Sequence, residues 1–373
     1  GSGTGEGGDL NLNIDGFHAT SNRMRNDGRA SLPLSGGADL FAQYTRARIS
    51  NMLSIDAISI GAVSQGGSIL ITNSEFSAEN SRFVGCSASA GGCMQASAGA
   101  FVSLEAVDFS GGRAQLLDGG AIQCSSCDGL ILQACTFESC TAARNGGAVR
   151  ARSILAPGSF SIVDSTVTQA TARSGGGISV LQSTMHVSNT TFEQCEAQWR
   201  GGGLHVVRPI LGNIRESTII GCKAPLGGGG IAIQHDTDSD NVVGISISNS
   251  VLSDNTACQG LELSPEGFNQ QCGGGGGALL VNRIRDNPFP VLDSSGHFSL
   301  VRTLRNVSLR VDVCDGTVLS GNTALAGGAV LAEHHGVRLS IHSTCEQPLE
   351  SMSDAREVIL DGNSAMQRGG ALA

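Results

Sequence analysis

The sequence predicts an all-β fold, a single-stranded parallel β-helix (β-solenoid) of about 12 coils with roughly 27 residues in each. Three observations predict it. A glycine pair followed by a small and then an aliphatic residue recurs along the chain, the segments between these repeats alternate apolar and polar residues, and no stretch carries a capped helical pattern. With 373 residues, 53 of them glycine, the chain is long enough to build a continuous core.

The aliphatic position after each glycine pair marks the repeat. Successive anchors lie 25 to 29 residues apart as far as Ile231 and 42 to 51 residues apart beyond it. The later coils therefore carry insertions, which we place at Gln259–Gln271, Asp286–His297 and Thr344–Ala355. The ten anchors are Ile69, Met94, Ile122, Val149, Ile178, Leu204, Ile231, Leu279, Val330 and Leu372.

A second motif lies upstream of each glycine pair and consists of an apolar residue, then Cys or Asn, then Ala. Phe137-Glu138-Ser139-Cys140-Thr141-Ala142 is one example, and Asn322-Thr323-Ala324 shows the version with Asn. Since one coil cannot bury its apolar face alone, it must stack on its neighbours at about 4.8 Å, which turns equivalent residues into ladders. The glycine pair suits a corner where φ is positive or where backbones pack closely.

Between the anchors, alternation with period two predicts strands that bury one face. The clearest examples are 245–251 and 307–311. We expect residues 1–373 to be one continuous β-helix segment, part of a longer chain. Within it, 1–65 form less regular N-terminal coils, 66–231 form regular coils and 232–373 form coils with insertions.

The combined pattern F-x-x-N/C-x-A followed by G-G-A-[ILV] resembles the repeats of chlamydial polymorphic outer membrane proteins and related β-helix repeat proteins. The resemblance covers about residues 66–373 and, more faintly, 1–65. It implies a right-handed parallel β-helix that is exposed at a cell surface and acts as an adhesin. This chain differs from that pattern in using Cys where the family often has Asn.

The 12 cysteines allow several arrangements. Cys195 and Cys222 occupy one column in adjacent coils, at a spacing that a disulfide can bridge. Cys258 and Cys272 flank an insertion, and Cys314 and Cys345 are candidates across the next coil. A ladder of reduced, buried thiols is the alternative. The cluster Cys124, Cys127, Cys135 and Cys140 raises zinc as an option, but a rigid solenoid spreads these side chains over different faces, so disulfides are favoured.

Composition excludes some partners and favours an oxidising compartment. The net charge is −10, and the single Lys and 22 Arg are scattered along the sequence, which argues against nucleic-acid binding. No apolar stretch is long enough for a transmembrane helix. Two glycosylation sequons begin at Asn189 and Asn306. Together with the cysteines, they predict an extracellular or cell-surface protein.

A search for chemistry gives one candidate metal site and no catalytic motif. Asp236, Asp238 and Asp240 alternate in a way that could place oxygens around calcium, although an EF-hand pattern fails and a solvated acidic turn is the alternative. Glu138 and Glu193 share a position but lie two coils apart, with Thr168 between them. We expect no other cofactor.

The sequence therefore predicts a non-enzymatic surface rod, spacer or filament component. Its partners would be a protein or a glycan held by the insertion loops, or further copies joined end to end or side by side. The alternative is a polysaccharide lyase or glycoside hydrolase, because parallel β-helices also carry such enzymes.

Overall fold

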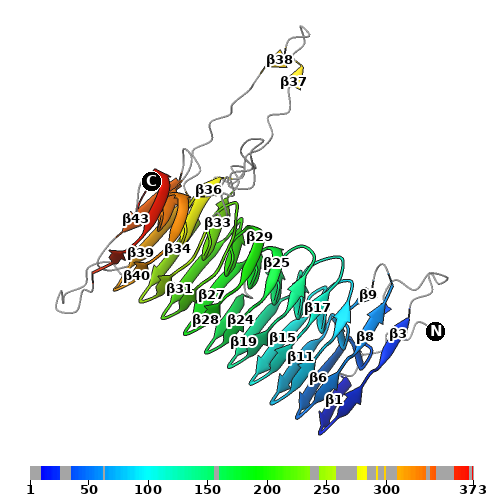
Figure 1. The fold of residues 1–373 in the computed structure, drawn as a ribbon. Coiled ribbons are helices and arrows are strands. Elements are labelled where there is room, and N and C mark those ends of the chain that lie inside the picture. The colour runs from blue at the N-terminus through cyan, green and yellow to red at the C-terminus, as the bar shows by residue number, and fades with distance from the viewer. Residues whose placement is uncertain are drawn as a thin grey trace, which may run out of the picture.

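The computed structural model describes residues 10–25, 35–61, 64–154, 159–235, 243–257, 275–283, 291–292, 298–299, 309–332, 337–341, 357–368 and 372. Within these ranges the chain winds into coils that stack as a rod, with no helix (Figure 1). The predicted all-β parallel solenoid is confirmed. The two longest sheets hold 11 strands each, one per coil, which is fewer than the about 12 coils predicted from the repeat.

Each regular coil passes through sheet A, sheet B, sheet C and sheet E in turn. Sheet A contains β1 (Leu10–Asp15), β6 (Thr45–Ser50), β11 (Glu75–Glu79), β15 (Phe101–Glu105), β19 (Gly129–Gln133), β23 (Phe160–Val163), β27 (Thr184–Ser188), β31 (Leu211–Arg215), β34 (Val243–Ser248), β39 (Leu309–Cys314) and β43 (Val337–Ile341).

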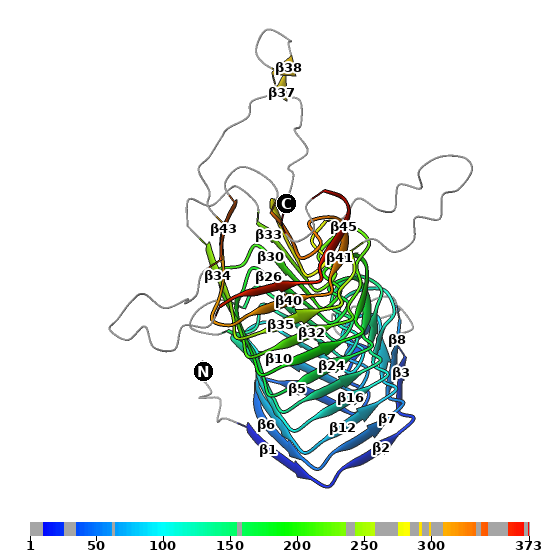
Figure 2. The ribbon, with the colours of Figure 1, turned by 60° about the vertical axis from the view of Figure 1, so that its left-hand side comes forward.

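Sheet B follows sheet A after one sharp turn, and Figure 2 shows β1 and β2 meeting there in a V. Its strands have three residues each: β2 (His18–Thr20), β7 (Leu53–Ile55), β12 (Arg82–Val84), β16 (Asp108–Ser110), β20 (Thr136–Glu138), β24 (Thr166–Thr168), β28 (Thr191–Glu193), β32 (Thr218–Ile220), β35 (Val251–Ser253), β40 (Val318–Ser320) and β44 (Ile359–Asp361).

Sheet C is the shortest of the four, and sheet E closes the coil. Sheet C contains β3 (Arg23–Arg25), β8 (Ile58–Ile60), β13 (Ser87–Ala88), β17 (Arg113–Ala114), β21 (Thr141–Ala142), β25 (Thr171–Ser174) and β29 (Glu196–Arg200). Sheet E contains β5 (Leu40–Gln43), β10 (Ile69–Thr72), β14 (Met94–Ser97), β18 (Ile122–Ser125), β22 (Val149–Arg152), β26 (Ile178–Leu181), β30 (Leu204–Val207), β33 (Ile231–His235), β36 (Leu279–Arg283) and β42 (Val330–Ala332).

Two pairs of strands lie outside these sheets: the parallel pair β4 (Ser35–Gly36) and β9 (Ser64–Gln65), which is sheet D, and the antiparallel pair β37 (Val291–Leu292) and β38 (Phe298–Ser299). The parallel pair β41 (Thr323–Ala326) and β45 (Ser364–Arg368) continues sheet C, which reaches it through isolated bridges at Lys223 and Thr256.

The predicted anchors form one ladder in sheet E. Val149 pairs in register with Ile122 on one side and with Ile178 on the other. The register continues across the first insertion, because Ile231 pairs with Leu279. It ends at Val330, which is bridged to the last anchor, Leu372. All ten anchors predicted from the sequence therefore occupy one column.

The chain turns at most corners through a single residue with positive φ. Between sheets A and B these residues include Asn80, Asp164 and Glu216, with φ of 48°, 51° and 51°. One alternating pattern was therefore misread: the predicted strand 245–251 is divided by Asn249, whose φ of 47° ends β34 and allows β35 to begin at Val251. The apolar residue that seemed to extend the alternation, Val251, is exposed, whereas its neighbours Ser250 and Leu252 are buried, so the buried positions change phase at the turn.

The glycine pair forms the corner between sheets C and E. The first glycine has a positive φ, as in Gly146 with 67°. The second has no room for a side chain: a Cβ on Gly147 would meet the carbonyl oxygen of Gly176 and lie 2.6 Å from the nitrogen of Thr171. Both reasons given for this motif are confirmed, one for each glycine.

Apolar columns from sheets A, B and E meet in one core, whereas buried alanines of sheet C (Ala114, Ala142 and Ala172) form a small cluster of their own. In sheet B, Phe83, Phe109 and Phe137 are fully buried, and their rings stack with centroids 5.1 Å apart. The first coils differ, because Ser54 stands in this column and donates to Asp39, which also accepts from Asn22 and Ser68. This polar cluster explains why the repeat is weak in residues 1–65.

Candidate functional surfaces and columns

The position shared by Cys and Asn in the second motif forms a column inside the turn between sheets B and C. Both residue types donate to the same acceptor, the carbonyl oxygen of the apolar residue one coil earlier. Asn255 Nδ2 lies 2.8 Å from the oxygen of Ile219, and Cys195 Sγ lies 3.5 Å from the oxygen of Val167. A thiol can therefore replace the amide as a donor in this column.

Asparagine adds an acceptor that cysteine does not provide. Asn322 Oδ1 accepts from the backbone nitrogen of Asn255 at 3.0 Å and from its Nδ2 at 3.1 Å. Asn363 receives the same two bonds from Asn322. In the C-terminal coils the column is thus a continuous amide ladder, in which the buried polar groups of Asn255 and Asn322 are satisfied by their neighbours in the column.

The predicted disulfide between Cys195 and Cys222 is wrong. Both are free, buried thiols in adjacent coils of this column, which agrees with the alternative given above, a ladder of reduced thiols. The column directs each sulfur toward a backbone carbonyl, and Cys222 lies close enough to Cys195 for a hydrogen bond between the two side chains. Cys314 is disulfide-bonded. Cys258, Cys272 and Cys345 lie outside the described residues.

Two other disulfides join cysteines that the sequence did not pair. Cys86 is bonded to Cys93, with Cα atoms 4.8 Å apart, and links the Cys/Asn column to the position after the glycine pair in the same coil. Cys124 is bonded to Cys127, with Cα atoms 6.1 Å apart, while Cys135 and Cys140 are free. The four cysteines considered for zinc are therefore divided between a disulfide and two separate thiols. The pair Cys86–Cys93 could have been predicted from the repeat, because its two cysteines stand at two motif positions of one coil.

Burial changes the acidity of the thiols of Cys135, Cys140 and Cys222. Burial raises the pKa of Cys135 to about 11 and that of Cys140 to about 12, and it also raises the pKa of Cys222. Since the thiolate is the reactive form, we expect these cysteines to resist alkylation at pH 8 in the folded protein and to react fully in denaturant. Peptide mapping after iodoacetamide treatment measures this, and rapid labelling of Cys140 under native conditions would contradict it.

The remaining predicted sites have different outcomes. Asn189 is exposed at the turn between sheets A and B, where its Nδ2 donates to Asp164 at 2.7 Å. Asn306 and the possible calcium ligands Asp236, Asp238 and Asp240 lie outside the described residues. In the part of the chain that is described, no three His, Cys, Asp or Glu side chains are grouped so that they could hold a metal ion.

The two carboxylates considered for catalysis lie where the repeat placed them. Glu138 pairs in register with Thr168, and Thr168 pairs with Glu193, on the outer face of sheet B. Two strand spacings, roughly 9.6 Å, therefore separate the two glutamates along the rod. Both are exposed.

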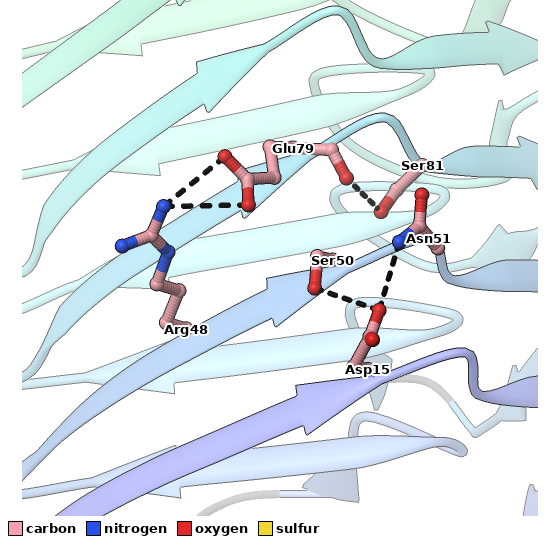
Figure 3. Close-up of polar contacts among 6 residues, drawn as sticks. All are labelled: Asp15, Arg48, Ser50, Asn51, Glu79 and Ser81. Atoms are coloured by element: carbon pink, nitrogen blue, oxygen red, sulfur yellow. Dashed lines mark hydrogen bonds and ion pairs between the residues drawn. The ribbon is translucent and has the colours of Figure 1, made fainter.

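At the N-terminal end, polar contacts on the outer face of sheet A connect consecutive coils (Figure 3). Asp15 accepts from Asn51 Nδ2 at 2.8 Å and from Ser50 Oγ at 2.9 Å, and these two bonds lower the pKa of its carboxyl group. In the next pair of coils, Arg48 Nη2 lies 3.2 Å from Glu79 Oε2. Because these groups are exposed, each contact contributes little stability and mainly aligns neighbouring coils.

A column of buried polar residues lies on the outer face of sheet E, which the sequence analysis did not identify. Arg150, Ser179 and His205 are buried and follow one another in register, and Gln123, which is half-buried, precedes them in the same column. Arg150 is 6% exposed, donates to Ser179 Oγ, and has its Nε 4.0 Å from Asp118 Oδ2. The signal lay in the residue that directly follows each aliphatic anchor, which is polar in several coils although both of its neighbours in sequence are apolar.

His205 makes the stability of this column dependent on pH. Its Nε2 lies 2.7 Å from Gln234 Oε1. Burial, reinforced by Arg150 and Arg200, lowers the pKa of His205 to about 4, and the hydrogen bond to Gln234 only partly opposes this. Below about pH 6.5 the imidazole of His205 binds a proton in the unfolded chain but not in the folded one, so acid lowers the free energy of unfolding.

We expect His205 to account for a loss of about 2 kcal/mol of unfolding free energy between pH 7 and pH 5. The variant His205→Gln should lose that part of the pH dependence, since Gln occupies the same column at Gln95 and Gln123. Urea denaturation of both proteins at the two pH values measures the difference. Equal acid sensitivity of the two proteins would contradict the assignment.

Within the described ranges there is no helix with the length and apolar character needed to cross a bilayer. Comparison of the chain with protein-family models, with curated proteins and with solved structures found no match.

Proposed function

We propose that this chain is a non-enzymatic structural rod of an extracellular or cell-surface assembly, which holds partner-binding loops at fixed distances. The observation that carries the proposal is the unbroken register of sheet A from β1 to β43, in which each inner strand is bonded to both neighbouring strands. Such a stack resists bending because any bend must break ladder hydrogen bonds or open the core.

The disulfides support an extracellular or cell-surface location. Cys86–Cys93, Cys124–Cys127 and the bonded Cys314 fit an oxidising compartment better than a reducing one. The exposed sequon at Asn189 is compatible with it. We further propose that the insertions at Gln259–Gln271, Asp286–His297 and Thr344–Ala355 bind a protein or glycan partner, since loops on a rigid scaffold commonly carry recognition.

Hydrogen exchange measured by mass spectrometry tests the rigidity that this function needs. We expect the strands of residues 66–231 to exchange slowly and together, because their amides are paired on both sides. A coil in this region that exchanges within seconds would make the chain a flexible linker and would remove the basis of the proposal.

An activity assay tests the absence of catalysis. The purified chain should release no product from a panel of acidic and neutral polysaccharides, with or without calcium. If turnover appears and is lost in Glu138→Gln or Glu193→Gln, the chain is an enzyme on a β-helix scaffold and the structural role is wrong.

A further inference from the structure

The charged residues of the central coils are sorted onto opposite sides of the rod. Residues 100–235 contain nine Lys or Arg and nine Asp or Glu, so this segment has a formal charge of zero while the whole chain has −10. We divide its surface into an A–B side, formed by sheets A and B and their turn, and a C–E side, formed by sheets C and E and their loop. The A–B side carries six acids and one base, whereas the C–E side carries seven bases, of which Arg150 is buried, and two acids. Asp128 and Arg208 lie in the turns between sheets E and A and belong to neither side.

The bases of the C–E side form a row with at least one member in each of five consecutive coils. Arg113 begins β17, Arg144 follows β21, Arg173 lies in β25, Arg200 ends β29, and Lys223 is bridged to Glu196 in the coil before it. The row therefore repeats at the coil spacing of about 4.8 Å. Arg113, Arg144 and Arg173 are exposed.

This row has one aromatic member. The guanidinium carbon of Arg173 lies 3.3 Å from the ring centroid of Trp199, and Trp199 is itself 44% exposed. The pair holds one cation in place and adds apolar area to the centre of the row, where an interface gains most from an anchor of this kind.

The same five coils each carry at least one acid on the A–B side. Glu105 and Asp108 lie in the first of these coils, and the following four contribute one acid each. All six carboxylates are exposed. The four single acids are Glu138, Asp164, Glu193 and Glu216.

We propose that the C–E side of one copy docks on the A–B side of a second copy, so that rods lie side by side. Like charges stacked at the coil spacing repel one another, and an opposite row removes that penalty. Because both rows belong to one solenoid, they have the same axial repeat, and two parallel rods match coil by coil. One partner contributes its C–E side and the other its A–B side, so each rod keeps one side free after pairing. Further rods can therefore add, and the assembly is an open row.

The neutral charge of the segment favours a second copy over a foreign polyanion. A polyanion would use the bases alone and would leave the acidic row, which has the same length and repeat, without a role. The inference rests on the proposed structural function, because only a rigid rod keeps both rows straight enough to match.

Two charge-reversal variants of the 373-residue chain test the pairing. The first is R113E/R144E/R173E on the C–E side, and the second is E138R/D164R/E193R on the A–B side. Sedimentation velocity at about 20 mM salt should show association of the unchanged protein, which should disappear near 0.5 M salt. Each variant alone should be monomeric at low salt, and an equimolar mixture of the two should associate again.

The matched control is R46E/R48E/R82E, which changes the net charge by the same amount as the first variant but lies in coils outside the two rows. It should associate like the unchanged protein. Hydrogen exchange separates a failed interface from a failed rod, because an unchanged protein that is monomeric at low salt but keeps its strand protection overturns only the docking proposal, and each variant should keep the same protection as the unchanged protein.

Three results would overturn the proposal: an unchanged protein that is monomeric at low salt, variants that do not associate when mixed, or loss of association in the control. Dextran sulfate serves as the probe for the competing partner. If the unchanged protein stays monomeric but binds dextran sulfate through Arg113, Arg144 and Arg173, the row is a polyanion site instead.

Discussion

Replacing Gly147 by alanine is expected to lower the unfolding free energy by about 3 kcal/mol. The added Cβ would meet the carbonyl oxygen of Gly176 and approach the nitrogen and oxygen of Thr171 at 2.6 and 2.7 Å. These are backbone atoms of the next coil, so no side chain can rotate away to make room. The two coils would have to move apart where their hydrogen bonds form.

Gly244→Ala is the matched control for that substitution. Gly244 lies in β34 of the same rod, does not have a positive φ, and has no atom within 4 Å of an added Cβ. We expect its unfolding free energy to stay within about 0.5 kcal/mol of the unchanged protein. Urea denaturation of both variants gives the comparison, and similar values for the two would contradict the role assigned to the second glycine.

Replacing Asn322 by leucine is expected to have a comparable effect for a different reason. Asn322 is fully buried, accepts two hydrogen bonds from Asn255, and donates from Nδ2 to the oxygen of Leu252 at 2.9 Å. Leucine would leave a buried backbone N–H and a buried carbonyl without partners. Such groups cost about 1–3 kcal/mol each, so we expect a total loss of about 3 kcal/mol.

Asn322→Cys distinguishes the donor from the acceptor role of the amide. A thiol at this position should still donate to the carbonyl of Leu252, as Cys222 does to Phe192, but it cannot accept from the backbone of Asn255 in the same way. Thermal unfolding should therefore place this variant between the unchanged protein and the leucine variant. A cysteine variant as unstable as the leucine variant would show that the donor bond does not matter.

The repeat made the fold predictable because stacking converts sequence period into spatial contact. Val149 and Ile178 are 29 residues apart in sequence and partners in sheet E, as the glycine-pair spacing predicted. Corners were harder to predict, because several of them use an ordinary residue with positive φ in place of glycine. Asn249 shows this, since it stands at a position where the alternation calls for an apolar residue, and its positive φ marks the corner there.

The sites were less predictable than the fold for a related reason. The repeat shows which residues stack in one column, but it does not show in which direction each side chain points. Cys195 and Cys222 were therefore predicted to form a disulfide, although the sulfur of each lies against a backbone carbonyl group. The charge pattern was missed because arginines were considered along the chain, where they look scattered. Sorted by their place in the coil, Arg113, Arg144 and Arg173 fall on one side.

The register of sheet E has a consequence for how such a chain can change. Ile231 and Leu279 remain partners although 48 positions separate them, so the stack tolerates extra sequence between β33 and β36 without shifting any later pair. The added sequence lies between strands, after one described strand has ended and before the next has begun. Foreign peptides grafted at such junctions should be displayed at set intervals along the axis, which would make this chain a modular carrier as well as a support.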